Sequence, residues 1–150
     1  QRTATDSRLI GRELGSASSN MAASPNYLAR FGIPQTLGDL ASHRRLLHRN
    51  PGNGKLLCWW DDQTSVTEEH AAFISTSPDT LVDAALCDMG IVCLADWYLE
   101  EHFRNERLIP ILKPFWPRPR SMHIWYPSAD LPPRVRAWVD FVLAQFPPQA

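Results

Sequence analysis

Hydrophobic and polar positions between residues 71 and 97 fall into three blocks that predict a strand, a helix and a second strand. The apolar runs 71–74 and 91–95 each have the length and continuity of a buried strand. The block between them, 78–89, carries apolar residues at the three- and four-residue spacing of a helix with one buried face. Two strands joined through a helix in this way run parallel. The apolar positions of the predicted helix are Val82, Ala85, Leu86 and Met89.

Three hydroxyl side chains lead from the first of these strands into the helix. Ser77 has a side chain preferred at a helix N-cap, and Gly90 suits the position just after a helix end, where a left-handed backbone is common. Free backbone N–H groups at a helix start attract anions, and Ser75 and Thr76 add two hydroxyl groups there. The sequence therefore predicts a binding site for a small anionic or polar ligand at the start of this helix.

The remaining elements are predicted to be short. Ser24 is placed to cap a helix over 25–30 that ends at Gly32, and Thr36 to cap another over 36–40. A strand that contains Pro110 is expected at a sheet edge, since proline cannot donate a hydrogen bond to a neighbouring strand. The further predicted strands are 9–15, 20–23, 46–48, 55–60, 108–112 and 122–126.

The last helix, which begins at Pro132 and Pro133, has the clearest period in the chain. Its apolar residues recur at i, i+3, i+4, i+7, i+8 and i+11, so we expect them to form one buried face. These residues are Val135, Trp138, Val139, Val142, Leu143 and Phe146.

Composition narrows the class of protein. The 150 residues suffice for one ordinary domain, and 44% hydrophobic with 21% charged residues is typical of a globular chain. A net charge of −1 gives no electrostatic reason for this chain itself to bind nucleic acid. No apolar run is long enough to span a membrane, and no signal peptide is recognisable. We therefore expect a cytoplasmic protein whose three cysteines, Cys58, Cys87 and Cys93, are buried packing thiols.

Motifs of known chemistry are missing from the sequence. The histidines do not show metal-ligand spacing, and there is no nucleophile elbow, phosphate-binding loop or dinucleotide fingerprint. We expect no catalytic residue, no metal site and no cofactor, so an enzyme with α/β layers is the least favoured alternative.

In their order and spacing, several short sequence segments resemble those of the effector-binding domain of LysR-type transcriptional regulators. Together these segments cover nearly all of residues 7–146. The matching segments are LIGRELG (9–15), ASPNYLARFG (23–32), TLGDL (36–40), 81–91, LADW (94–97), RLIPIL (107–112), YPS (126–128) and PRVRAWVDF (133–141).

This resemblance implies an α/β, periplasmic-binding-protein-like (type 2) fold with two lobes, one complete and one partial. It assigns 24–92 to the second lobe and 1–23 with 93–150 to the remaining part of the first lobe. Members of the family also carry a winged helix-turn-helix and a linker helix, and nothing in this sequence resembles either. We therefore expect that the chain does not bind an operator by itself and that DNA contacts come through a helix-turn-helix absent from it.

The family likeness further implies a small-molecule effector, such as a carboxylate or an aromatic compound, and self-association as a homodimer or tetramer in a bacterial regulator. Two alternatives to a ligand role stay open at this stage: Ser77 can simply cap its helix, and Arg12 can be a solvated residue on a strand. A solute-binding protein of a transport system shares the two-lobed architecture and is the alternative function. The candidate effector-binding residues are Ser75, Thr76, Ser77, Arg12, Ser24, His48, Asn50, Cys93 and Leu94.

Overall fold

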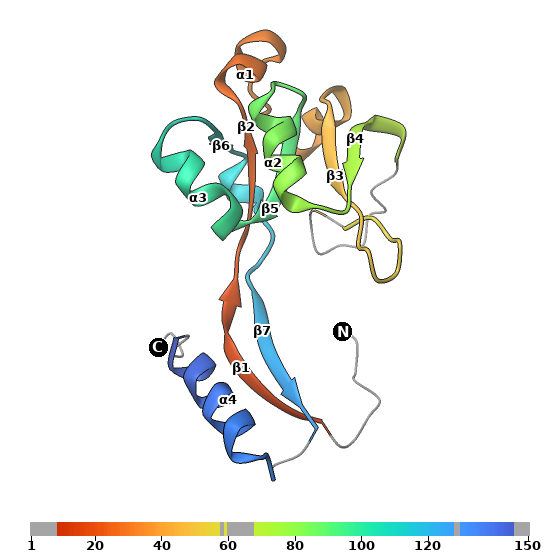
Figure 1. Ribbon diagram of the computed structural model, residues 1–150. Coiled ribbons are helices and arrows are strands. Elements are labelled where there is room, and N and C mark those ends of the chain that lie inside the picture. Colours follow the sequence, from red (N-terminus) through yellow and green to blue (C-terminus); the bar gives the residue numbers. More distant parts are fainter. Residues whose placement is uncertain (1–8, 58, 60–67, 128–129, 146–150) are drawn as a thin grey trace. The chain divides into compact units, whose positions relative to one another are not determined.

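Two compact units make up the described part of the chain (Figure 1). The larger unit spans Ser18–Arg118, and the smaller unit combines the residues up to Ala17 with those from Pro119 onward. The chain therefore passes from one unit to the other at two points. The computed structural model describes residues 9–57, 59, 68–127 and 130–145.

The units divide the chain at different places from the predicted lobes. The prediction assigned 24–92 to one lobe, whereas the flanking residues 18–23 and 93–118 also belong to the larger unit. The reason is that β5 (Ile91–Ala95) lies in the middle of this unit's sheet and α3 (Asp96–Arg104) contacts that sheet. The assignment of either unit to a lobe of the family stays a prediction.

A five-stranded mixed sheet with the strand order β4-β3-β5-β2-β6 forms the larger unit. Strand β3 lies between β4 and β5 and runs parallel to both, whereas β2 is antiparallel to β5 and β6. The two strands of the predicted strand–helix–strand segment are therefore parallel, as expected, but β3 separates them. The other strands of this sheet are β2 (Ser19–Ala23), β3 (Arg45–His48), β4 (Ala71–Ser75) and β6 (Ile109–Ile111).

Both faces of this sheet are covered, because successive residues of a strand point to opposite sides. Met21 packs in one core with Tyr27 and Leu40, while its neighbour Ala22 packs in a second core with Leu81 and Leu99. Helix α1 and the 3₁₀ helix η1 thus cover one face, and α2 with α3 covers the other. The bounds of these and the remaining short helices are α1 (Pro25–Phe31), η1 (Leu37–Ser42), η2 (Glu68–His70), α2 (Pro78–Leu86) and η3 (Lys113–Phe115).

Helix α1 begins and ends where the sequence predicts. The Ser24 hydroxyl accepts a hydrogen bond from the Tyr27 backbone N–H at 3.1 Å, and Gly32 follows the helix with a φ of 84°. The buried Tyr27 hydroxyl then joins the helix to the start of β3. It lies 2.9 Å from His43 Nδ1 and accepts a hydrogen bond from the Arg44 backbone N–H at 3.0 Å. Burial raises the pKa of Tyr27, so the neutral hydroxyl holds this connection.

Helix α2 begins as predicted but ends earlier. Ser77 is its N-cap, and its hydroxyl accepts a hydrogen bond from the Thr80 N–H. The predicted end at Gly90 is wrong: the helix ends at Leu86, and the residue with left-handed backbone is Asp88, with a φ of 62°. Gly90 has a different role. A Cβ atom there would lie 2.5 Å from the Arg44 carbonyl oxygen, so the close approach of β3 and the start of β5 requires glycine.

Strand β6 confirms the predicted edge strand, since it pairs with β2 only and contains Pro110. The predicted strand 55–60 falls partly outside the described residues, because Cys58 and Trp60 are among those not described. Where that segment is described, it forms only an isolated bridge between Leu56 and Arg49.

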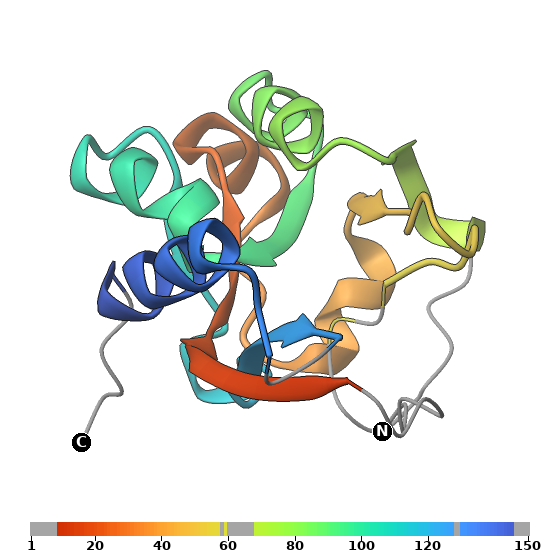
Figure 2. The same cartoon turned by 60° about the horizontal axis from the view of Figure 1, so that its bottom comes forward.

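The smaller unit contains an antiparallel pair of strands and one helix. Strand β1 (Ile10–Ala17) pairs with β7 (Arg120–Tyr126), with a shift in register between Glu13 and Gly15. Helix α4 (Pro133–Gln145) runs alongside β1 (Figure 1 and Figure 2). Its position was predicted correctly.

The predicted buried face of α4 is wrong in part. Val139 is only 4% exposed, but Trp138 is 59% and Val135 is 37% exposed. Phe146 lies outside the described residues. Val142 and Leu143 are half-buried, so the apolar stripe is covered only in part.

The cysteine prediction holds in part for one of the two described cysteines, because Cys93 packs against the core but is only partly buried. Cys93 lies in β5, and burial raises the pKa of its thiol to about 12. Cys87 is exposed just after α2, which contradicts the expectation of a packing thiol. Cys58 lies outside the described residues.

None of the described helices has both the length and the hydropathy needed to cross a membrane. In the same part of the chain, no group of three or more histidine, cysteine, aspartate and glutamate side chains is arranged to hold a metal ion.

Replacing Gly90 with alanine should destabilise the protein, because the added methyl group meets the Arg44 backbone at 2.5 Å. We expect the free energy of unfolding to fall by about 1–3 kcal/mol, as for other overpacked sites. Urea denaturation measures this change. Gly38→Ala is the matched control, because its nearest contact is 3.6 Å away and its stability should change little. Equal stability of the two variants would contradict the role assigned to Gly90.

Removing the hydroxyl group of Tyr27 should also weaken the fold. In Tyr27→Phe the Arg44 N–H and the His43 ring lose their partner, and a buried polar group left unpaired costs about 1–3 kcal/mol. Thermal and urea denaturation test this expectation. The comparison is Tyr98→Phe, since the Tyr98 hydroxyl has no hydrogen bond to any residue of the described part. A loss of similar size in both variants would contradict the bridging role of the Tyr27 hydroxyl, because Tyr98→Phe removes a hydroxyl group that joins no elements.

Cys87 and Cys93 should differ in their reaction with iodoacetamide. A thiol with a pKa of about 12 is a thiolate in only about one molecule in 10⁴ at pH 8, so alkylation of Cys93 should be at least about 100-fold slower than alkylation of the exposed Cys87. Pulse labelling followed by peptide mass spectrometry gives both rates. Labelling in urea is the control, where the two rates should converge. Similar rates in the folded protein would overturn the burial of Cys93.

Candidate functional site

The strongest candidate site lies where the parallel strands β3 and β4 end. The backbone N–H of Arg49, just after β3, donates to the Ser75 carbonyl at 2.9 Å, and His48 is the register partner of Ser75. His48 Nε2 lies 3.2 Å from the Thr76 carbonyl oxygen. These contacts hold the two strand ends together as one edge.

A hollow of about 310 Å³ opens at this edge, lined by Arg49, Ile74, Ser75 and Thr76. Ile74 supplies an apolar wall, and Thr76 is exposed. The Arg49 guanidinium is held by the Gly54 carbonyl oxygen and by the Glu68 carboxylate. The hollow therefore combines a cation, two hydroxyl groups and an apolar side next to the start of α2.

Two hydroxyl groups of the Ser75–Ser77 segment already take part in hydrogen bonds within the chain. The Ser75 hydroxyl accepts from the Ser77 N–H at 3.0 Å, and the Ser77 hydroxyl caps α2. Ser77 does not line the hollow, and the contact that its side chain makes is the cap of α2. Thr76 is the member of the Ser75–Ser77 segment whose side chain is both exposed and on the lining.

Asn50 is a turn residue. Its side-chain oxygen accepts from the Gly52 N–H at 2.8 Å, and its carbonyl oxygen accepts from the Gly54 N–H. Asn50 is therefore close to the hollow in sequence but does not line it, whereas its neighbour Arg49 does. Of the candidates His48 and Asn50 and the residue between them, Arg49, only Arg49 lines the hollow.

Cys93 and Leu94 lie in β5, on the far side of β3 from Ser75. Leu94 is 5% exposed and packs in the core with α2 and α3, while Cys93 packs against the opposite core. They belong to different faces of the sheet, so they do not form one wall. Asn20, the register partner of Leu94, was not predicted as a candidate although its side-chain oxygen is buried without a hydrogen-bond partner among the described residues.

Ser24 lies at the other end of the strands of this sheet. It follows the end of β2, and because β2 is antiparallel to β5, this end lies beside the start of β5, away from the ends of β3 and β4. The Ser24 hydroxyl donates to Asp88 Oδ1 at 2.5 Å, and Asn26 donates to the other oxygen at 3.4 Å. Ser24 therefore does not join Ser75 and Thr76.

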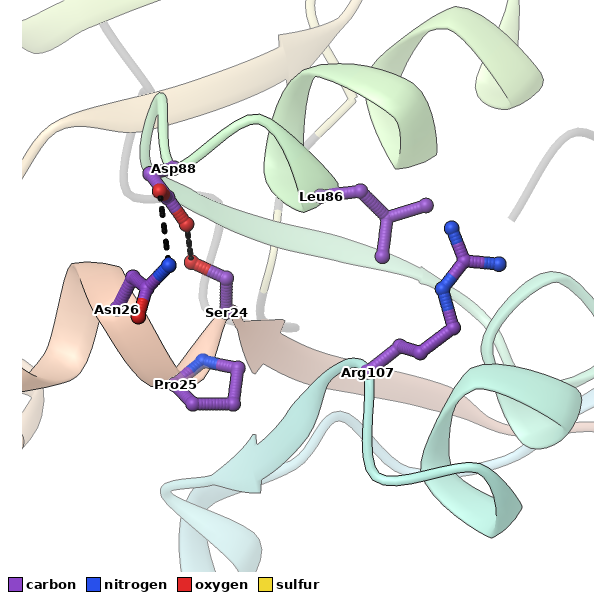
Figure 3. A pocket seen from close by; sticks show the side chains of 6 residues that line it. All are labelled: Ser24, Pro25, Asn26, Leu86, Asp88 and Arg107. Carbon is purple, nitrogen blue, oxygen red and sulfur yellow. Dashed lines mark hydrogen bonds between the residues drawn. The ribbon is translucent and has the colours of Figure 1, made fainter.

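A second hollow, of about 210 Å³, surrounds this pair (Figure 3). The Asp88 carboxylate is turned toward Ser24 and Asn26, while the Arg107 side chain points toward Leu86. These hydrogen bonds explain why Asp88 can keep a left-handed backbone, which aspartate tolerates better than most residues. The arrangement stabilises the turn between α2 and β5.

Arg12 belongs to the smaller unit, in β1, and lines a hollow there with Tyr126 and residues of α4. The predicted group is thus divided: Ser75, Thr76 and His48 lie together, Cys93 and Leu94 lie two strands away, and Ser24 is at the other edge.

Comparisons with known proteins agree with this architecture. The family LysR substrate binding domain matches residues 1–147. The regulatory domain of CrgA, a LysR-type transcriptional regulator from Neisseria meningitidis, superposes with a TM-score of 0.77 at 28% identity, over 97% of this chain and 72% of that one.

Two curated relatives are similar in sequence. An uncharacterized HTH-type transcriptional regulator of Haemophilus influenzae is 33% identical over 126 residues, which are 82% of this chain and 43% of that protein. The regulator CrgA of Neisseria meningitidis serogroup B is 29% identical over 93% of this chain and 48% of its own length. The chain thus spans about half the length of these relatives. With its periplasmic-binding-protein-like α/β fold, it belongs to the LysR substrate-binding domain family of transcriptional regulators.

Proposed function

We propose that this chain is the effector-sensing portion of a LysR-type regulator and that the hollow at the ends of β3 and β4 forms part of its effector site. The observation that supports this most directly is the position of Arg49 and Thr76 at the carboxyl ends of two adjacent parallel strands. In open α/β sheets, ligands bind outside the carboxyl ends of the strands.

The chemistry of the hollow favours a small carboxylate as the effector. Arg49 offers a planar guanidinium that can bind a carboxylate through two hydrogen bonds, and the Thr76 hydroxyl can donate a third. The present partner of Arg49 is Glu68, whose side chain is 63% exposed. Such an exposed ion pair contributes little stability, so a ligand carboxylate can replace Glu68 at low cost.

The other predicted residues take supporting roles in this proposal. His48 fixes the edge of the hollow through the Thr76 carbonyl oxygen, and Ser75 and Ser77 shape the start of α2. Cys93 and Leu94 support the neighbouring strand. Ser24 and Asn50 stabilise turns through their own hydrogen bonds and are not needed for ligand contact.

The proposal extends to the whole regulator. The curated relatives are described as HTH-type regulators, so DNA binding would come from a helix-turn-helix and not from this chain. The effector would bias the arrangement of a homodimer or tetramer on DNA in the bacterial cytoplasm, without catalytic turnover. Similarity to regulators, and not to transport proteins, favours this function over a solute-binding protein.

A thermal-shift screen of small carboxylates against the intact protein tests the site. A compound that binds the folded state raises the melting temperature as its concentration increases. For such a compound, Arg49→Met should weaken the apparent affinity by about tenfold or more, because a charge-assisted pair is lost. Thr76→Ala should weaken it by a smaller factor.

Arg118→Met is the matched control, since Arg118 is an exposed arginine of the same unit that does not line this hollow. It should leave the shift unchanged. Ser77→Ala is not a clean test, because it removes the cap of α2. If a compound stabilised the wild type, Arg49→Met and Thr76→Ala to the same extent, the effector site would have to lie elsewhere.

A further inference from the structure

The smaller unit contains a hollow of about 250 Å³ between β1, β7 and α4. Ile10 and Tyr126 are register partners on its strand side, and Arg12 lies two residues further along β1, so all three side chains point to the same face. The helix side is formed by residues of α4. The hollow thus lies within one unit and does not depend on the site at β3 and β4.

The face of helix α4 that borders this hollow carries charged residues as well as apolar ones. Arg136, Val139, Asp140 and Leu143 line it, at the i, i+3, i+4 and i+7 spacing of one helix face. The more apolar Trp138 and Phe141 are instead 59% and 61% exposed. The helix therefore places two charged groups beside the strands, around the buried Val139.

The charges of the hollow do not balance. Arg12 and Arg136 contribute two guanidinium groups, and Asp140 contributes one carboxylate. Arg136 interacts with another residue, whereas Arg12 has neither a hydrogen bond nor an ion pair within the described part of the chain. One positive charge is thus available, next to the hydroxyl group of Tyr126 and an apolar wall made by Ile10, Val139 and Leu143.

We propose that this hollow binds a small organic monocarboxylate, with its carboxylate on Arg12 and its apolar part against Val139 and Leu143. Its volume is below the range of about 300–1,000 Å³ that is common for drug-sized ligands, so a single-ring or branched aliphatic acid fits best. Asp140 repels a second negative charge, which disfavours dicarboxylates. The site is separate from the proposed effector site and gives the regulator a second ligand input.

Calorimetric titration of the intact protein with sodium benzoate tests this inference. Benzoate should bind the wild type with a dissociation constant in the range of about 0.1–10 mM. Arg12→Met should weaken binding by about tenfold or more, whereas Arg12→Lys, which keeps the charge, should weaken it less. Benzamide, which has the same shape without the charge, and phthalate, which carries two charges, should both bind more weakly than benzoate.

Two control variants show whether benzoate binds in this hollow or at another arginine. Arg134→Met removes an arginine from α4 that does not line the hollow, and Arg49→Met removes the cation of the proposed effector site. Arg134→Met should leave benzoate affinity within about twofold of the wild type, and Arg49→Met should leave the binding event that depends on Arg12 in place. The melting temperature of each variant without ligand shows whether it is folded.

Three results would overturn the inference. The first is equal affinity of folded Arg12→Met and wild type for benzoate. The second is loss of benzoate binding in Arg49→Met, which would place benzoate at the ends of β3 and β4 and support the proposed function instead. The third is no saturable binding up to about 20 mM benzoate, which is beyond the affinity expected of a specific charge-assisted site.

Discussion

Strand β3 is parallel to both of its neighbours, β4 and β5, and this arrangement fixes where a ligand can bind in the larger unit. The carboxyl ends of parallel strands lie on the same side of the sheet, so the residues that follow β3 and β4 are brought together there. Gly90 makes the arrangement possible, since only glycine lets the start of β5 approach the Arg44 carbonyl oxygen. The rest of the unit, with helices on both faces of the sheet, protects these strands from solvent.

The same arrangement separates polar groups that look equivalent in sequence. Ser24 and Ser77 both precede a proline and both cap a helix. Because β2 runs antiparallel to β5, the cap at Ser24 lies at the amino end of the parallel strands, and the cap at Ser77 lies at their carboxyl end. Only the second position is at the edge where Arg49 lies, so the two serines have different surroundings and different roles.

The two hollows proposed to bind a carboxylate differ in how the arginine of each is held. Arg49 is already paired with Glu68 and with a backbone carbonyl oxygen, so a ligand must compete for it. Arg12 has no such pairing within the described residues, and Asp140 supplies a nearby negative charge on the opposing helix. The first hollow therefore suits a ligand that exchanges with an internal carboxylate, and the second suits one that adds a single negative charge.

The sequence by itself determined the local elements. The caps at Ser24 and Ser77, the edge strand at Pro110 and the parallel direction of β4 and β5 all depend on residue preferences within a few positions, and the structure contains each of them. The tertiary structure alone decided that β3 lies between these strands and that Arg49 lines the hollow. It also decided that Gly90 serves a close contact and that α4 borders the smaller hollow with charged residues. These features depend on which segments distant in sequence pack together, and hydrophobic periodicity carries no information about that choice.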